Sequence, residues 1–152
     1  MNRYFQVICR GFTLVELIVV IAVIGILTSI AAAQYSNYVS RTRASSAAIE
    51  LKKMKQAVSL CAMETDISNC DGGSFGIPLA ASFATTKNVL SLDSIVGGVI
   101  TATIGATDSA GAPLTVILTG SINPVGANIL WVNSGTSCES PRGFRSGTGD
   151  CS

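Results

Sequence analysis

The sequence feature that most constrains the fold is an apolar run from residue 12 to residue 33. These 22 residues carry a single charged side chain, Glu16. A helix of that length is about 33 Å long, which is enough to cross the hydrocarbon core of a bilayer. A carboxylate inside such a helix costs about 2.5–3.5 kcal/mol at the bilayer centre and less toward one face, where Glu16 lies. We therefore expect Glu16 to have a partner.

The segment that precedes this run, residues 1–11, does not fit an ordinary secretory signal. It is short and polar, and the apolar residues follow it instead of lying within it. On hydropathy alone, an uncleaved signal anchor fits equally well. Arg3 and Arg10 predict that the segment stays on the cytoplasmic side, because basic residues are enriched in cytoplasmic flanks of membrane helices.

The composition argues against several classes of function. The chain has 152 residues, enough for one domain, and only 12% of them are charged. Removing residues 1–11 leaves a net charge of −1, which disfavours an extended nucleic-acid surface. There is no histidine, no CxxC pair for zinc, no glycine-rich phosphate loop and no GxSxG motif. We therefore predict a protein that is not an enzyme and that has no cofactor or metal.

The sequence GFTLVE at residues 11–16 resembles the N-terminal processing motif of the type IV pilin family. A basic leader precedes it and an unbroken apolar helix follows it, and the resemblance covers about the first 55 residues. It implies that a membrane peptidase, the prepilin peptidase, cuts between Gly11 and Phe12 and methylates the new Phe12 amine. It also implies that Glu16 acts in assembly, by pairing with the N-terminal amine of a neighbouring subunit.

A second pattern extends the helix well beyond the apolar run. Small and apolar residues recur at spacings of three and four: Ala44, Ala47, Leu51, Met54, Val58 and Cys61. They predict one helix over residues 12–63. Its first half, residues 12–33, would lie in the membrane or the filament core, and the rest would pack on a globular head spanning 34–152. Pilins usually have a helix-bending proline where this chain has Ala33, so the usual bend is in question.

The remainder of the chain predicts a small antiparallel sheet. Three strand candidates, residues 99–107, 114–119 and 127–133, are separated by turn-forming residues. Residues 77–95 are poorly patterned and are predicted to be a connecting loop with at most a short helical turn. Trp131 is interpreted as a packing residue. The predicted fold class is α+β, the type IV pilin fold, with a long N-terminal helix packed on the sheet and a C-terminal disulfide loop.

Four cysteines follow the leader, which itself contains Cys9. They allow three connectivities, of which nearest-neighbour pairing, Cys61–Cys70 and Cys138–Cys151, is the simplest. The resemblance implies that the late pair closes the disulfide-bonded loop of pilins, which in some relatives touches host surfaces. Arg142, Phe144 and Arg145 are the candidate surface contact in that loop, because an aromatic between two arginines suits an interface. Ser152 resembles the C-terminal residue that carries a glycan in some relatives.

The resemblance implies a structural subunit that polymerises through its N-terminal helix into a surface filament for adhesion, motility or DNA uptake. The chain would be inserted in the inner membrane before assembly and would then become part of an extracellular pilus. Its partners would be further copies in a helical filament, the prepilin peptidase, an inner-membrane assembly platform, an outer-membrane secretin and, in some relatives, a host surface or DNA.

Two alternatives stay open. A DNA-binding minor pilin for natural transformation would present a basic stripe, and the candidates for it are Lys52, Lys53, Lys55, Lys87, Arg142 and Arg145. A pseudopilin of a type II secretion system would share the N-terminal features. Major pseudopilins typically lack a late cysteine pair, which favours the pilin interpretation.

Overall fold

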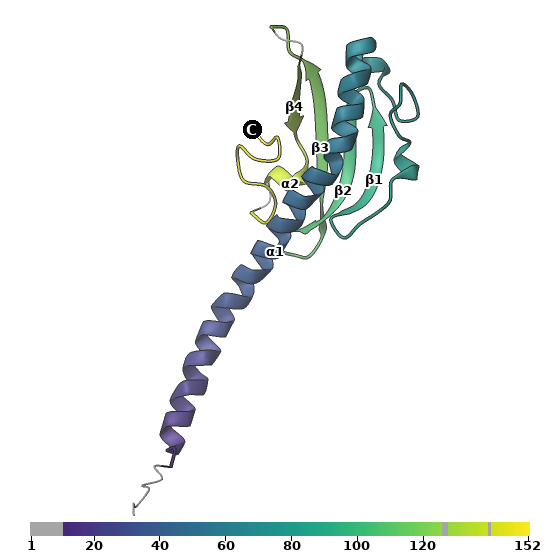
Figure 1. The fold of residues 1–152 in the computed structure, drawn as a ribbon. Coiled ribbons are helices and arrows are strands. Elements are labelled where there is room, and N and C mark those ends of the chain that lie inside the picture. The colour runs from purple at the N-terminus through teal and green to yellow at the C-terminus, as the bar shows by residue number, and fades with distance from the viewer. Residues whose placement is uncertain (1–10, 126–127, 140) are drawn as a thin grey trace, which may run out of the picture. The chain divides into compact units, whose positions relative to one another are not determined.

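The computed structural model describes residues 11–125, 128–139 and 141–152. The chain divides into two compact units after Tyr35. We describe each unit by itself and call the second, Ser36–Ser152, the head. Helix α1, Leu14–Glu64, begins in the first unit and ends in the head, and its helical residues continue through Ala33 without a break (Figure 1).

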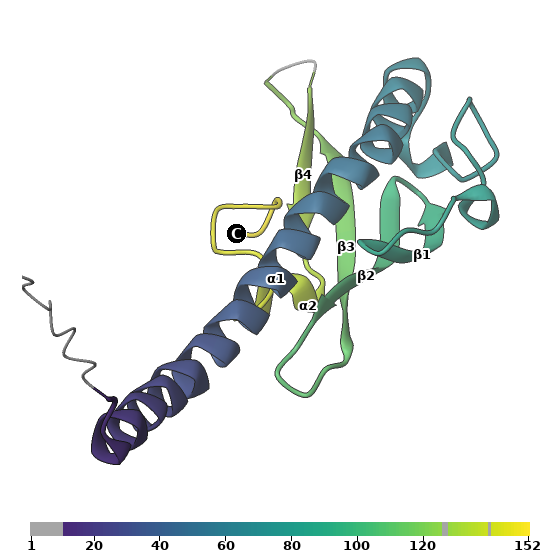
Figure 2. The same cartoon turned by 60° about the horizontal axis from the view of Figure 1, so that its bottom comes forward.

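The head contains the amphipathic part of α1. The predicted stripe of small and apolar residues is confirmed, because every member from Ala44 to Cys61 is buried. Ser40 and Ala62 extend the buried face at its two ends. The stripe and the inner face of the sheet form one hydrophobic core. Figure 2 shows this part of α1 lying across one face of the sheet.

Among the described residues, the sheet has four antiparallel strands in sequence order. It is the predicted antiparallel meander with one strand more than the three expected. The strands are β1 (Val89–Val96), β2 (Val99–Thr107), β3 (Pro113–Ile122) and β4 (Ile129–Asn133). Alternation is regular at the centre, so the side chains at every second position point to the helix and are buried. The buried residues of the two central strands include Ile100, Ala102, Ile104, Leu114, Val116 and Leu118.

Strand β1 corrects the prediction of a loop over residues 77–95. Its pairing with β2 shifts register twice, between Val89 and Ser91 and again between Leu92 and Ser94. Each shift adds a residue, so the buried positions Val89, Leu92 and Ile95 recur every third residue. The two-residue period that identifies a strand from sequence is therefore absent. The rest of the segment is irregular and contains the predicted short turn, the 3₁₀ helix η2 at Ala80–Ser82.

Two disulfides tie the ends of the head to its core. Cys61 at the end of α1 pairs with Cys70, which follows the 3₁₀ helix η1 (Ile67–Asn69), and Cys138 in the short helix α2 (Thr136–Glu139) pairs with Cys151. This is the nearest-neighbour connectivity. The C-terminal segment also joins the sheet directly, because Cys151 forms a parallel bridge with Asn133 at the end of β4.

Candidate processing and assembly site

The chain leaves the bond between Gly11 and Phe12 open to a peptidase. Phe12 is 78% exposed, and a Cβ atom built on Gly11 would meet no other atom within 4 Å. Both residues precede α1 and carry no regular secondary structure. A peptidase needs accessible backbone, and Gly11 and Phe12 are both exposed. Arg3, Cys9 and Arg10 lie outside the described residues.

Glu16 closes a capping box with Thr13 at the start of α1. The backbone N–H of Thr13 donates to Glu16 Oε2 at 2.9 Å, and the Thr13 hydroxyl donates to the same oxygen at 2.8 Å. In return, the backbone N–H of Glu16 donates to Thr13 Oγ1 at 3.2 Å. These bonds satisfy N–H groups that a helix start leaves without partners. They also hold the Glu16 carboxylate against Thr13, the residue that follows Phe12.

The capping box was not predicted, although its signal is local. The sequence Thr-Leu-Val-Glu ahead of an apolar run is the threonine-x-x-glutamate pattern of such a box. The cost of a charge in an apolar helix pointed instead to a partner on another chain. The structure adds a partner within the same turn.

In the described part of the chain, the apolar stretch of α1 that follows Glu16 is exposed. The apolar side chains from Leu14 to Ile30 are all exposed, and among the described residues α1 is the one helix long and apolar enough to cross a membrane. A surface this apolar is stable only in lipid or against other apolar surfaces. By length and composition, this part of α1 suits a membrane as well as packing against other apolar helices.

At the other end of the chain, buried Asn133 organises the C-terminal loop. Its side-chain oxygen accepts from the backbone N–H groups of Ile117, at 3.2 Å, and Gly135, at 3.0 Å. Its side-chain nitrogen donates to the Ser137 hydroxyl at 3.3 Å and to the carbonyl of Gly149 at 3.1 Å. One amide thus joins β3, the β4–α2 turn, α2 and the C-terminal loop. Sequence patterns did not identify this residue.

The candidate surface contact of Arg142, Phe144 and Arg145 does not form as one patch. Phe144 is only 9% exposed and belongs to the hydrophobic core, where its ring packs against Gly149. Arg142 reaches across the head and donates to the Asp108 carbonyl at 2.7 Å and to the Ser36 hydroxyl at 2.7 Å. Arg145 alone of the three is exposed. The aromatic is buried because the disulfide loop folds back on the sheet.

Comparison with known proteins adds independent evidence. The chain matches the family model described as the prokaryotic N-terminal methylation motif over residues 8–32, a range that contains the Gly11–Phe12 bond and Glu16. It is 40% identical over 95 residues to "Prepilin peptidase-dependent protein D" of Escherichia coli (strain K12), which is 62% of each chain. It is 37% identical over 101 residues to "Fimbrial protein EcpC" of Eikenella corrodens, 66% of each chain.

Over a shorter range, the chain is 44% identical to "Type IV major fimbrial protein FimA" of Dichelobacter nodosus, across 55 residues and 35% of that protein. It thus spans between about a third and two thirds of the length of these relatives. The methylation motif, the named relatives and the fold agree. The chain belongs to the type IV pilin family.

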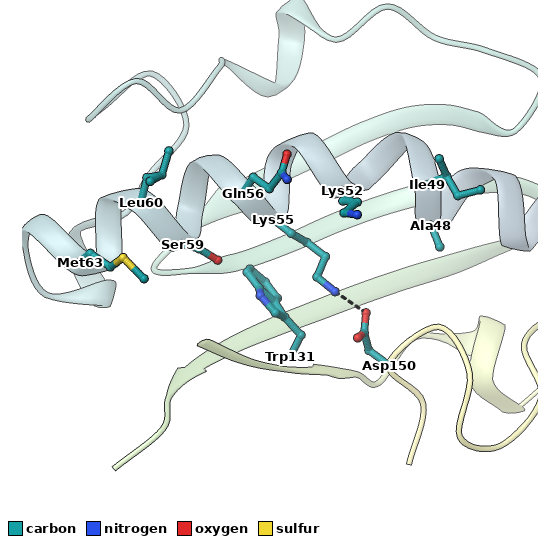
Figure 3. Close-up of a pocket in the computed structure, with 10 residues that line it drawn as sticks. All are labelled: Ala48, Ile49, Lys52, Lys55, Gln56, Ser59, Leu60, Met63, Trp131 and Asp150. Atoms are coloured by element: carbon teal, nitrogen blue, oxygen red, sulfur yellow. Dashed lines mark hydrogen bonds and ion pairs between the residues drawn. The ribbon is translucent and has the colours of Figure 1, made fainter. Parts of the chain in front are cut away.

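The head of this pilin has a groove between α1 and the β4 edge of the sheet (Figure 3). We call it the helix groove. The residues that define it are Ile49, Lys52, Gln56, Leu60, Met63 and Trp131. Its cavity volume is about 650 Å³. At one wall, Lys55 Nζ lies 2.7 Å from Asp150 Oδ2 and 5.3 Å from the centre of the Trp131 ring. Trp131 is half-buried and packs against the core, but it also faces this groove.

The helix lysines of this pilin do not lie together. Lys52 and Lys55 line the helix groove, whereas Lys53 lies on the other side of α1 with Pro78 and Thr86. Lys55 is paired with Asp150. The helix lysines among the candidates for a basic stripe thus line two different pockets.

Proposed function

We propose that this pilin is a structural subunit of a type IV pilus, with an assembly role and no catalytic one. The observation that carries the proposal is the exposed apolar part of α1, headed by the capping box of Thr13 and Glu16 and by the accessible Gly11–Phe12 bond. The methylation motif coincides with this segment. Each feature is needed by a subunit that is first held in a membrane and then moved into a filament.

In this proposal, a prepilin peptidase removes residues 1–11 and methylates the amine of Phe12. The Glu16 carboxylate, held near that end of the chain by Thr13, is available to the amine of a neighbouring subunit. An ammonium and a carboxylate that pair in an apolar environment each lower the cost of burying the other. Assembly would thus select subunits that have been processed.

The subunit would lie in the inner membrane before assembly and in an extracellular pilus afterwards. Its partners would be other copies, an inner-membrane assembly platform and an outer-membrane secretin. Both disulfides suit this location, because such bonds persist in oxidising surroundings outside the cytoplasm. The late pair, Cys138–Cys151, also favours a pilin over a secretion pseudopilin.

The test is the intact mass of protein sheared from the cell surface, measured with and without reductant. We expect a species that spans Phe12–Ser152, heavier by one methyl group and lighter by the four hydrogens of two disulfides. Extra mass would indicate a glycan, for which Ser152 is the candidate. A protein that stays in the membrane fraction and enters no filament would replace this proposal with a minor-pilin or pseudopilin role. A species that begins at Met1 would overturn the processing step.

A further inference from the structure

We infer that the heads of successive subunits are joined by Phe75, an aromatic knob that inserts into the helix groove of a second copy of this chain. This inference rests on the proposed function, since it names the partner surfaces that a filament of this pilin would use. It is built on four features of the head: an exposed aromatic, a groove with apolar walls, opposite charges, and the positions of the two surfaces.

The knob is an aromatic side chain held outward by the loop between Cys70 and Ile77. Phe75 is 55% exposed, and its φ of 48° lies in the left-handed region that residues other than glycine rarely adopt. The loop is fixed around it, because Gly73 N–H donates to the Ile77 carbonyl and Ile77 N–H donates to the Ser74 carbonyl, each at 2.8 Å. A strained, exposed aromatic in a fixed loop indicates a contact residue.

The helix groove offers the matching surface. Ile49, Leu60 and Met63 project from α1 and remain largely exposed, although they are apolar. They lie outside the buried stripe, and the described part of the head leaves them exposed. Trp131 closes the other wall. A cavity of about 650 Å³ with aromatic and methionine walls has room for a phenylalanine ring and its neighbours.

The charges of the two surfaces are complementary. Residues 64–76, which carry the knob, contain three acidic residues, Glu64, Asp66 and Asp71, and no basic one. In the groove, the ion pair with Asp150 occupies Lys55, which leaves the exposed Lys52 as the net charge of the wall. An acidic loop and a basic groove attract each other, and two copies of either surface repel. The occupant that fits is therefore the knob of another copy.

The positions of the surfaces make the contact intermolecular and repeating. The knob loop is bound to the β1 edge, since Gly72 N–H donates to the Ile95 carbonyl at 2.9 Å. The groove lies along β4, through Trp131. Because β1 and β4 are opposite edges of the sheet, a head cannot fill its own groove. A contact between two different patches leaves one patch of each kind free at the two ends of the assembly. It therefore propagates, and it gives an open helical filament when the rotation between subunits does not close into a ring.

The first experiment maps the contact in sheared filaments. Phe75 is replaced by the photo-crosslinker p-benzoylphenylalanine, and a matched strain carries it at Val125, which is 94% exposed on the β3–β4 hairpin. After irradiation, we expect the Phe75 position to give dimers whose adduct lies on Leu60, Met63 or Trp131 of the second chain. The Val125 position should give no adduct in the groove. Adducts of the Phe75 position outside the groove, or none, would overturn the inference.

The second experiment separates the contact from folding. Phe75→Gly removes the ring and suits the positive φ, so the thermal midpoint of unfolding should not fall. We expect the yield of sheared filament to drop by about tenfold or more, and Phe75→Tyr to retain it. Normal filaments from Phe75→Gly would refute the contact and leave the proposed function intact. Absence of this chain from wild-type filaments would refute the proposed function, and the contact with it.

Discussion

The side-chain nitrogen of Asn133 donates a hydrogen bond to the carbonyl oxygen of Gly149, 3.1 Å away and 16 residues later in the chain. A second bond runs the same way, from the backbone N–H of Asn133 to the Asp150 carbonyl at 2.7 Å. Together with the bridge between Asn133 and Cys151, they attach the C-terminal loop to the end of β4. The loop is therefore held by the sheet as well as by its disulfide.

Replacing this amide should destabilise the head strongly. Asn133→Leu has a similar shape but leaves the part-buried N–H group of Ile117 and the buried N–H group of Gly135 without their acceptor. Each unsatisfied group costs about 1–3 kcal/mol, so we expect a loss of about 3 kcal/mol in the free energy of unfolding. Guanidinium unfolding, followed by the fluorescence of the single tryptophan, Trp131, measures it. Ser134→Ala, at the adjacent exposed position, is the control. Equal stability of the two variants would contradict the role of Asn133 in holding the C-terminal loop.

The Cys138–Cys151 disulfide should contribute about as much to the free energy of unfolding as the Asn133 side chain, but by a different mechanism. Cys138 and Cys151 are separated by 13 residues, and closing a loop of that size stabilises the folded state by about 3 kcal/mol in the chain-entropy model. We expect the Cys138→Ser, Cys151→Ser double variant to lose about that much in the same unfolding assay. Because the Asn133 bonds remain, it should still fold. A double variant that cannot fold would show that the amide alone does not hold the loop.

These two residue sets show what the sequence could and could not predict. The buried stripe of α1 and strands β2 and β3 follow from short-range periodicity, which the structure keeps. Strand β1 was missed because its two register shifts remove the two-residue period. No periodicity marks Asn133, because the groups it binds come from four separate segments and meet only after folding.

The candidate contact at the C-terminus failed for a related reason. The order Arg142, Phe144, Arg145 describes neighbours in the chain, but burial depends on which way the loop folds. The loop returns to the sheet, so Phe144 enters the core while Arg145 stays outside. Phe75, by contrast, is an exposed aromatic of the head, in a glycine-rich loop where the sequence indicates only a turn.

Acid should weaken the turn that follows α1. Hydrogen bonds from Ser68 to the Asp66 carboxylate hold the pKa of Asp66 below its ordinary value. A carboxyl whose pKa is lower in the folded state stabilises that state above its unfolded pKa, and the contribution disappears as the pH falls through the folded pKa. We expect Asp66→Ala to be less stable than wild type at pH 7 and the difference to shrink below about pH 4. Unfolding curves at pH 7 and pH 3 test it, with Asn69→Ala as a neighbouring control. A difference that is the same at both pH values would contradict the charge-dependent cap.

Gly11→Ala should separate processing from folding. An added methyl group meets no atom within 4 Å, and Gly11 lies outside α1, so the fold of the chain has no reason to change. Any effect must then arise in the peptidase site, where a glycine before the cut leaves room that a side chain fills. We expect the variant to keep residues 1–11, to lack the methyl group on Phe12 and to be absent from sheared filaments, while its head retains the wild-type unfolding curve. Intact mass and the same fluorescence assay measure both properties. A variant cleaved as fast as wild type would show that the peptidase does not require glycine at this position.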